Sequence, residues 1–298
     1  MLEPYSVDHD RIKELWCKWR DTETMIRELG GSYEARNAYE RFLLAKANGE
    51  ISAKETLLQE LRHKNISFDS DFIEELDSNI SVFPYYHEEV PIIIKTVKNA
   101  LVLSWGRRHD RLPITEQIRV LLTLADPVAI FCCSLRYRSL AMGSQHWGLP
   151  LKYFQNLAIR NEGFASPFNA RVLHLQPPGV FCSLCPEVDA IFGSVGNFFT
   201  TTLQDYPGIW MVNPPFIETI MTKAIQHTLA SGVEAYSLLP AWDDAEAIQL
   251  CKKHGEIHEY LAAGEYKLVN ANSESFTANF PCYVFHLGGK GTTDTKVP

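Results

Sequence analysis

An Asn213-Pro214-Pro215-Phe216 motif could hold an amino group for a reaction. It follows the apolar run 209–212 and precedes a segment with helical spacing. Proline lacks the N–H that a strand ladder needs and is excluded from helix interiors, so the two prolines indicate a rigid exit from a strand into a helix. In such a turn the side-chain oxygen of Asn213 and the carbonyl oxygen of Pro214 can both accept from one small donor. Phe216 offers a flat face on which a planar base can stack.

These residue types suit methyl transfer from S-adenosylmethionine to the amine nitrogen of a planar base. The lone pair of an aromatic amine is delocalised into its ring, so the nitrogen is a weak nucleophile in solution. Two acceptors that hold both N–H groups favour a pyramidal nitrogen and stabilise the positive charge that develops on it during in-line attack. No strong base is needed beforehand, because the proton leaves after the nitrogen has become cationic.

A purely structural interpretation competes with this one. The motif is short enough to occur by chance in unrelated loops. It would then be only a rigid turn between a strand and a helix, with Asn213 capping that helix.

The residues beyond about 150 predict the α/β framework that would position the motif. Strand and helix patterns alternate there, which is typical of crossover units around a mostly parallel sheet. Open α/β sheets bind ligands in the crevice beyond the carboxyl ends of their strands, where a motif directly after a strand would lie. The expected elements are strands over 164–165, 209–212, 235–239, 259–268 and 282–287, and helices over 151–161, 216–230 and 243–254.

The residues before about 145 predict a mainly helical domain. Apolar spacing predicts a helical hairpin over 8–48, broken at Gly30-Gly31, and shorter helices over 53–63 and 71–77. The run 91–105 fits a strand or a helix, and 114–141 predicts two helices separated at Asp126-Pro127. We therefore expect domains over 1–145 and 146–290, with a disordered tail over 291–298.

Basic residues gather in one stretch of an otherwise acidic chain. The net charge is −8, yet residues 95–138 hold eight basic and three acidic residues and so carry +5. This asymmetry is compatible with one anionic ligand site and also with a solvated helix face. Arg136 and Arg138 could bind a phosphate or a cofactor carboxylate through their guanidinium groups, or form surface ion pairs.

The composition is that of a globular protein, with 46% hydrophobic and 21% charged residues. No apolar run reaches the roughly 20 residues that a membrane helix needs, and the start of the chain is unlike a signal peptide, so we expect a soluble protein in a reducing compartment. The seven cysteines are scattered and odd in number. Cys182 and Cys185 form a lone C-x-x-C with no further ligands at a matching spacing, so we expect no metal site.

Three further stretches accompany the motif in a characteristic order. GFASPFNARVL (163–173) and FCSLCPEVDAIFGSVGNFF (181–199) precede it, and AYSLLPAWDD (235–244) follows it. In this order they resemble the phosphorylated-CTD-interacting-factor family of cap-specific adenosine-N6 methyltransferases. The likeness runs from about Arg136 to Trp242. It implies a Rossmann-like, S-adenosylmethionine-dependent methyltransferase domain that acts on the first transcribed adenosine, next to the 7-methylguanosine cap of mRNA.

Carried over by position, the resemblance implies roles for individual residues. The turn under the cofactor would be Ala165-Ser166-Pro167-Phe168-Asn169, and the cofactor wall would be completed by Asp189 and Phe192-Gly193-Ser194. The catalytic loop would be 213–216, and Trp242 would line the substrate side. The helical region would help to form a basic groove for the cap and its triphosphate, which implies substrate-binding roles for Arg107, Arg108, Arg136 and Arg138.

The sequence departs from the family pattern in several places. Phe168 and Ala241 stand where a leucine and an acidic residue are expected, and the first 100 residues give no residue-level match. We expect no WW module ahead of the helical region. The chain is therefore identified as a divergent member whose partner is the capped 5′ end of mRNA, and the resemblance favours the nucleus over the cytoplasm.

Two other functions remain open on the sequence. The same chemistry could act on adenine in internal RNA or in DNA, or the chain could be a non-catalytic RNA-binding subunit that retains the fold. Base flipping of duplex DNA usually needs a larger recognition domain, and the intact motif at 213–216 argues against a non-catalytic role.

Overall fold

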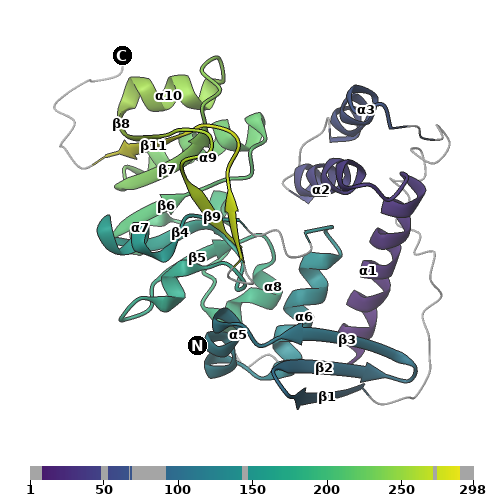
Figure 1. Ribbon diagram of the computed structural model, residues 1–298. Helices are drawn as coiled ribbons and strands as arrows, with labels where there is room; N and C mark the ends of the chain where they lie inside the picture. The colour runs from purple at the N-terminus through teal and green to yellow at the C-terminus, as the bar shows by residue number, and fades with distance from the viewer. Residues whose placement is uncertain are drawn as a thin grey trace. The chain divides into compact units, whose positions relative to one another are not determined.

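The computed structural model describes residues 9–47, 53–66, 68, 92–142, 147–270 and 274–288. The chain divides into two compact units, Met1–Gln145 and His146–Pro298, and each is described by itself (Figure 1). The helix predicted over 71–77 and the tail predicted over 291–298 lie outside the described residues.

The first unit begins with three helices, α1 (His9–Glu28), α2 (Tyr33–Ala47) and α3 (Ala53–His63) (Figure 1). Gly30 and Gly31 separate α1 from α2, as the sequence predicts. Their φ angles of 90° and 66° lie in the left-handed region that glycine enters without steric cost. The three helices share a buried core that includes Ile26, Phe42 and Leu57.

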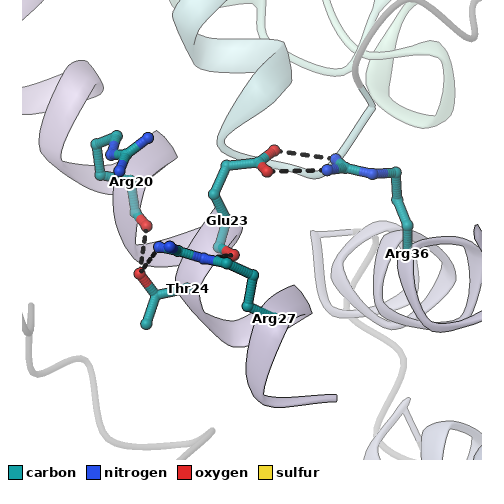
Figure 2. A network of polar contacts seen from close by, with 5 residues as sticks. All are labelled: Arg20, Glu23, Thr24, Arg27 and Arg36. Carbon is teal, nitrogen blue, oxygen red and sulfur yellow. Dashed lines mark hydrogen bonds and ion pairs between the residues drawn. The ribbon is translucent and has the colours of Figure 1, made fainter. Parts of the chain in front are cut away.

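Polar contacts tie α1 to α2. Figure 2 shows Arg36 donating to both carboxylate oxygens of Glu23, at 3.0 and 2.9 Å. Within α1, Arg27 donates to the Thr24 hydroxyl, which donates to the main-chain carbonyl of Arg20 (Figure 2). A bidentate guanidinium–carboxylate pair sets orientation as well as attraction, so Glu23 and Arg36 orient α2 against α1.

The ambiguous run after residue 91 forms strands. β1 (Ile92–Val97), β2 (Ala100–Trp105) and β3 (Arg108–Pro113) make an antiparallel sheet in that order. The sequence does not predict β3, because its residues are mostly charged. Two helices follow, α5 (Glu116–Leu124) and α6 (Pro127–Arg138), and the predicted break between them is confirmed. The Asp126 side chain caps α6 by accepting from the Ala129 N–H at 2.9 Å.

A six-stranded sheet forms the centre of the second unit, in the order β5-β4-β6-β7-β11-β8 (Figure 1). Its parallel strands are β4 (Ile159–Ala165), β5 (Val180–Ser183), β6 (Ile209–Val212) and β7 (Ala235–Pro240). β11 (Cys282–Leu287) runs antiparallel to both neighbours, β7 and β8 (Gly255–Leu261). The predicted α/β class is confirmed, and the sheet is mixed, with three parallel and two antiparallel strand pairings.

Helices pack against this sheet. α9 (Glu218–Ser231) and α10 (Glu246–His254) bury an apolar cluster with β7 and β11, including Ile225, Ile248 and Phe285. Near β4 lie α7 (Leu151–Asn156) and the 3₁₀ turn η1 (Arg171–His174). The remaining elements are α8 (Pro186–Asp189), the 3₁₀ turns η2 (Ala190–Phe192), η3 (Phe198–Thr200) and η4 (Leu203–Asp205), and a two-stranded ribbon of β9 (Lys267–Val269) and β10 (Ser275–Thr277).

Some predicted bounds are wrong. The helix predicted over 151–161 ends at Asn156, because Ala158 turns to a φ of 52° and the chain enters β4 at Ile159. The strand predicted over 259–268 is two strands, β8 and β9, separated by a turn at Gly264 with a φ of 83°. β5 and β10 are not predicted. The predicted bounds of β6 and β11 are confirmed.

Candidate active site

The sheet of the second unit reverses its winding between β4 and β6. β4 pairs with β5 on one side and with β6 on the other, and all three are parallel. The chain therefore leaves the carboxyl ends of β4 and β6 at a topological switch point, where open α/β sheets form their ligand crevice. Two of the predicted site segments start there: Ser166–Asn169 directly after β4, and Asn213–Phe216 directly after β6.

The loop after β6 presents two oxygens that the rest of the described chain does not use. The Asn213 side chain is half-buried, and no described residue forms a hydrogen bond with it. No described residue donates to the Pro214 carbonyl, whereas the next carbonyl, that of Pro215, accepts the Ile217 N–H at 2.7 Å. The first two acceptors of the motif therefore have no donor among the described residues, and Pro214 itself is buried, whereas the third acceptor closes the turn.

Asn213 does not cap the following helix. The N-cap residue of α9 is Ile217, and no side chain caps that helix. The structural interpretation of the motif required Asn213 to be the cap, so this part of it is wrong. The Asn213 side chain therefore has no capping role in α9.

Phe216 is anchored partly in the core. Its ring lies at 89° to that of Phe280, with centroids 5.9 Å apart, and it packs against the cluster of α9, α10 and β11. The ring is half-buried. The motif therefore ends in a packed aromatic residue that holds the loop against the sheet.

The loop after β4 is closed by its own side chains. The Asn169 side-chain oxygen accepts from the main-chain N–H of Ser166 at 2.7 Å and from the Ser166 hydroxyl at 3.1 Å. The main-chain N–H groups of Asn169 and Ala170 donate back to the Ser166 carbonyl. Ser166, Pro167 and Phe168 are buried. This is a rigid turn of the kind that Asn side chains stabilise.

A buried carboxyl group supports the same loop from β4. Glu162 accepts the main-chain N–H of Val172 at 3.3 Å, which ties η1 to the strand. Burial raises the pKa of Glu162 from 4.5 to about 8, against the lowering effects of the Val172 N–H and the Arg171 charge. At neutral pH this carboxyl group is mostly protonated.

The carboxyl end of β5 carries the remaining residues of the predicted cofactor wall. The Ser183 and Ser194 hydroxyls are 2.7 Å apart. Asp189 is fully buried, and its carbonyl accepts the Ser194 N–H at 3.3 Å. Phe192 is buried, and Gly193 follows with a φ of 98°. These residues lie around the carboxyl end of β5, the strand that pairs with β4.

Trp242 lies just past the carboxyl end of β7, the strand next to β6. It is 44% exposed, and its main-chain N–H donates to the Pro240 carbonyl at 2.7 Å. The Ser237 hydroxyl joins the two strands by donating to the Val212 carbonyl, directly before the motif, at 3.0 Å. The same sheet edge therefore holds the ends of β5, β4, β6 and β7.

The four arginines predicted to bind substrate belong to the first unit. Arg107 is exposed in the turn between β2 and β3, and Arg108 lies 4.5 Å above the Trp105 ring. Arg138 pairs with Asp110 at 2.7 Å and lies over the Trp19 ring. Arg136 is half-buried in α6. The substrate-binding role of these arginines stays a prediction, and the Asp110 pair reduces the free charge of Arg138.

The seven cysteines all lie in the described residues; they are buried, and none forms a disulfide. Within the described ranges there is no group of three or more His, Cys, Asp or Glu side chains that could hold a metal ion. The helices in those ranges include none that is long and apolar enough to cross a membrane.

A family model described as Phosphorylated CTD interacting factor 1 WW domain matches residues 125–252. The match supports the family resemblance. It covers less than half of the chain and runs from α6 into α10, so it includes both loops at the switch point.

The expectation that this chain has no WW module is wrong, because the matching model is itself described as a WW domain. The matched residues include β4 to β7. The model described as a WW domain therefore matches the parallel strands of the sheet and not a segment ahead of the helical region.

Sequence reasoning missed several residues around the site. Glu162, Ser183 and Gly148 carry no motif of their own, and Gly148 reaches the site only through pairing with Val269, more than a hundred residues away. For Ser183 the available signal was a polar residue at the end of the apolar run 180–182, whereas Glu162 stands in the polar run 160–162 and gave no such signal. Gly148 gave no signal of this kind.

Proposed function

We propose that this protein transfers a methyl group from S-adenosylmethionine to N6 of the cap-proximal adenosine of capped mRNA. The observation that carries the proposal is the pair of unused acceptors, the Asn213 side-chain oxygen and the Pro214 carbonyl. They follow a parallel strand at the switch point of the sheet. A primary aromatic amine has two N–H groups, which is the number that such a pair can hold.

The residues at the neighbouring strand ends fit the cofactor. Its amino acid and ribose parts carry many polar groups, and the Ser183–Ser194 hydroxyl pair offers hydroxyl partners for them, whereas the β4 loop offers a fixed shape. In this proposal Ser166–Asn169 lies beneath the cofactor, and Ser183, Ser194 and Asp189 belong to its adenosine side. When bound, the cofactor supplies a methyl group whose bond electrons stay on sulfur as the amine lone pair forms the new N–C bond.

The chain's own contribution is orientation and electrostatics. Asn213 and Pro214 accept the two amine hydrogens, which directs the nitrogen lone pair away from the loop. Their oxygens carry partial negative charge and stabilise the positive nitrogen during attack. The nitrogen then releases one proton to water. The prolines limit the movement of the loop, so little reorganisation is needed at the moment of reaction.

The proposed substrate is supported by the family likeness, and the proposed reaction is supported by the unpaired acceptors of the motif. Methyl incorporation into three nucleic acids tests the two together: capped RNA that begins with adenosine, the same RNA without a cap, and duplex DNA. We expect incorporation only into the capped RNA. Equal incorporation into uncapped RNA would indicate an internal RNA target, and calorimetric failure to bind S-adenosylmethionine would indicate a non-catalytic subunit.

A further inference from the structure

A two-stranded ribbon, held by buried polar side chains, lies near the 213–216 motif and has no role in the chemistry proposed above. The ribbon of β9 and β10 stands apart from the six-stranded sheet. Its strand β9 also forms a bridge with Gly148, whose N–H donates to the Val269 carbonyl at 3.1 Å and whose carbonyl accepts the Val269 N–H at 2.9 Å. Gly148 is therefore held by the ribbon.

Gly148 brings the ribbon to the motif. A Cβ atom built on Gly148 would lie 4.0 Å from the Asn213 side-chain nitrogen. A side chain at this position would therefore come into van der Waals contact with the Asn213 amide, and glycine leaves that space free. Since consecutive Cα atoms are 3.8 Å apart, the Cα atom of Trp147 lies within roughly 9 Å of the same amide.

Phe276 of the ribbon and Trp147, the residue before Gly148, form an aromatic pair. The rings of Trp147 and Phe276 have centroids 5.5 Å apart and an interplanar angle of 50°. Phe276 is 37% exposed, and Trp147 is half-buried. Two large rings side by side and partly open to solvent are suited to stack on a further planar group.

Buried polar side chains hold the ribbon in place. Arg171 is 7% exposed and donates to the carbonyls of Val269 and Asn270 at 3.2 and 3.0 Å. Asn270 is 1% exposed, and its side chain donates to the Glu274 carboxylate at 2.7 Å and accepts the Glu274 N–H at 2.9 Å. The Arg171 Nε atom is buried without a hydrogen-bond partner among the described residues, whereas its Nη2 atom and the Asn270 side chain form these bonds. The hydrogen bonds of these buried groups restrict the ribbon, so the aromatic pair is held in position before any ligand arrives.

We propose that Trp147 and Phe276 form a stacking platform for the nucleobase next to the target adenine in the RNA. This inference rests on the proposed function for its substrate. Trp147 directly precedes Gly148, the residue that lies near Asn213. A nucleotide next to the target adenine can reach across this distance. The stacked base comes either from the second transcribed nucleotide or from the cap guanine, and both present the same flat aromatic face.

Binding of a short RNA tests the platform without requiring methyl transfer. The probe is a fluorescein-labelled, 7-methylguanosine-capped pentanucleotide that begins with adenosine, followed by fluorescence anisotropy. We expect Trp147→Ala and Phe276→Ala each to weaken binding about tenfold, because stacking on an aromatic residue contributes about 1–3 kcal/mol per base. Trp147→Phe retains a flat ring and should restore most of the affinity.

Tyr260→Ala is the matched control, since Tyr260 is a 53% exposed aromatic residue on β8, at the outer edge of the sheet. It should bind the probe like the wild type. Two further probes identify the stacked base, one with an abasic second nucleotide and one without the cap. The probe on which Trp147→Ala no longer weakens binding is the one that lacks the stacked base.

Wild-type affinity in both alanine variants for all probes would overturn the platform, and so would a loss of equal size in Tyr260→Ala. Absence of methyl transfer by the wild type, with the dependence on Trp147 and Phe276 intact, would instead overturn the proposed function and leave the platform standing. Because Phe276 is largely outside the core, its variant keeps the test valid if Trp147→Ala fails to fold.

Discussion

The two loops at the switch point are made rigid in opposite ways. After β4, Asn169 and Ser166 hold each other through side-chain and main-chain hydrogen bonds, and the loop residues are mostly buried. After β6, Pro214 and Pro215 restrict the backbone through their rings. The first loop uses its polar groups to hold its own shape. In the second, no described residue donates to the Asn213 side-chain oxygen or to the Pro214 carbonyl.

This difference separates a supporting role from a chemical one. A loop whose polar groups are already engaged can offer a fixed shape to a bound cofactor. A loop that is rigid without internal hydrogen bonds can offer its acceptors to a reacting group. Substitutions in the two loops should therefore affect different steps, with cofactor binding sensitive to the first and turnover sensitive to the second.

The largest effect is expected at Asn213. Asn213→Ala should lower kcat by about 10²–10³, because removal of one group that stabilises transition-state charge has this size. Asn213→Asp keeps an accepting oxygen and should retain more activity than the alanine variant. Steady-state methyl transfer and calorimetry with S-adenosylmethionine measure the two steps separately. Unchanged turnover by a folded Asn213→Ala protein would remove this residue from the chemistry.

The next largest effect concerns stability and pH on the β4 side. Because burial raises the pKa of folded Glu162 from 4.5 to about 8, the folded state binds the proton more tightly than the unfolded chain. The stabilisation is complete below about pH 4.5 and is lost as the pH rises through about 8. Between pH 6 and pH 8 the free energy of unfolding should fall by roughly 2 kcal/mol from this group.

Urea unfolding of Glu162→Gln at both pH values measures this contribution, since glutamine cannot ionise. The variant should lose less stability than the wild type between pH 6 and pH 8. The pH dependence of Glu40→Gln, in the first unit, is measured for comparison, because burial raises the pKa of Glu40 to about 7. A pH dependence in Glu162→Gln identical to that of the wild type would show that the Glu162 carboxyl group does not titrate as described.

A smaller effect is expected for the Asn169 turn. Asn169→Ala removes the acceptor of the Ser166 N–H and hydroxyl and should weaken S-adenosylmethionine binding about tenfold, equivalent to about 1.4 kcal/mol. The kcat at saturating cofactor should change little. Asn169→Asp keeps the accepting oxygen and should bind the cofactor more tightly than Asn169→Ala. A fall in kcat with unchanged cofactor affinity would reverse the roles of the two loops.

The smallest effect should come from the second proline. Pro215→Ala leaves the carbonyl that accepts the Ile217 N–H and relaxes only the backbone, so it should cost about 0.4–1 kcal/mol of stability and lower kcat two- to fivefold. Pro207→Ala, in an exposed loop, is the control for loss of a proline elsewhere. If both variants lower kcat equally, the rigidity of the motif has no special role.

The alternation of apolar runs and helical segments was enough to predict the strands that carry the motif. β6 and β11 lie at their predicted bounds, because proline or glycine limits each short apolar run on both sides. Sequence reasoning failed where a single backbone angle decides the element, as at Ala158. It also failed where a strand holds polar residues, as in β3.

The candidate site was predictable only as far as local pattern reaches. The strand-to-helix turn at 213–216 follows from the prolines, whereas the meeting of this turn with Ser166–Asn169 depends on the parallel pairing of β4 with β6. The position of Gly148 near Asn213 depends on its pairing with Val269 in the ribbon and on Arg171, which are far from it in the sequence. Long-range pairings of this kind leave no periodic signal in one sequence.

The most direct test is mass spectrometry of cap nucleotides after reaction. Capped RNA that begins with adenosine is incubated with the wild-type protein and S-adenosylmethionine carrying a labelled methyl group, and nuclease then releases the cap with its first nucleotide. The account predicts one labelled methyl group on the adenine base of that nucleotide, and none with Asn213→Ala. Label on the ribose, label on internal nucleotides alone, or no label would contradict it.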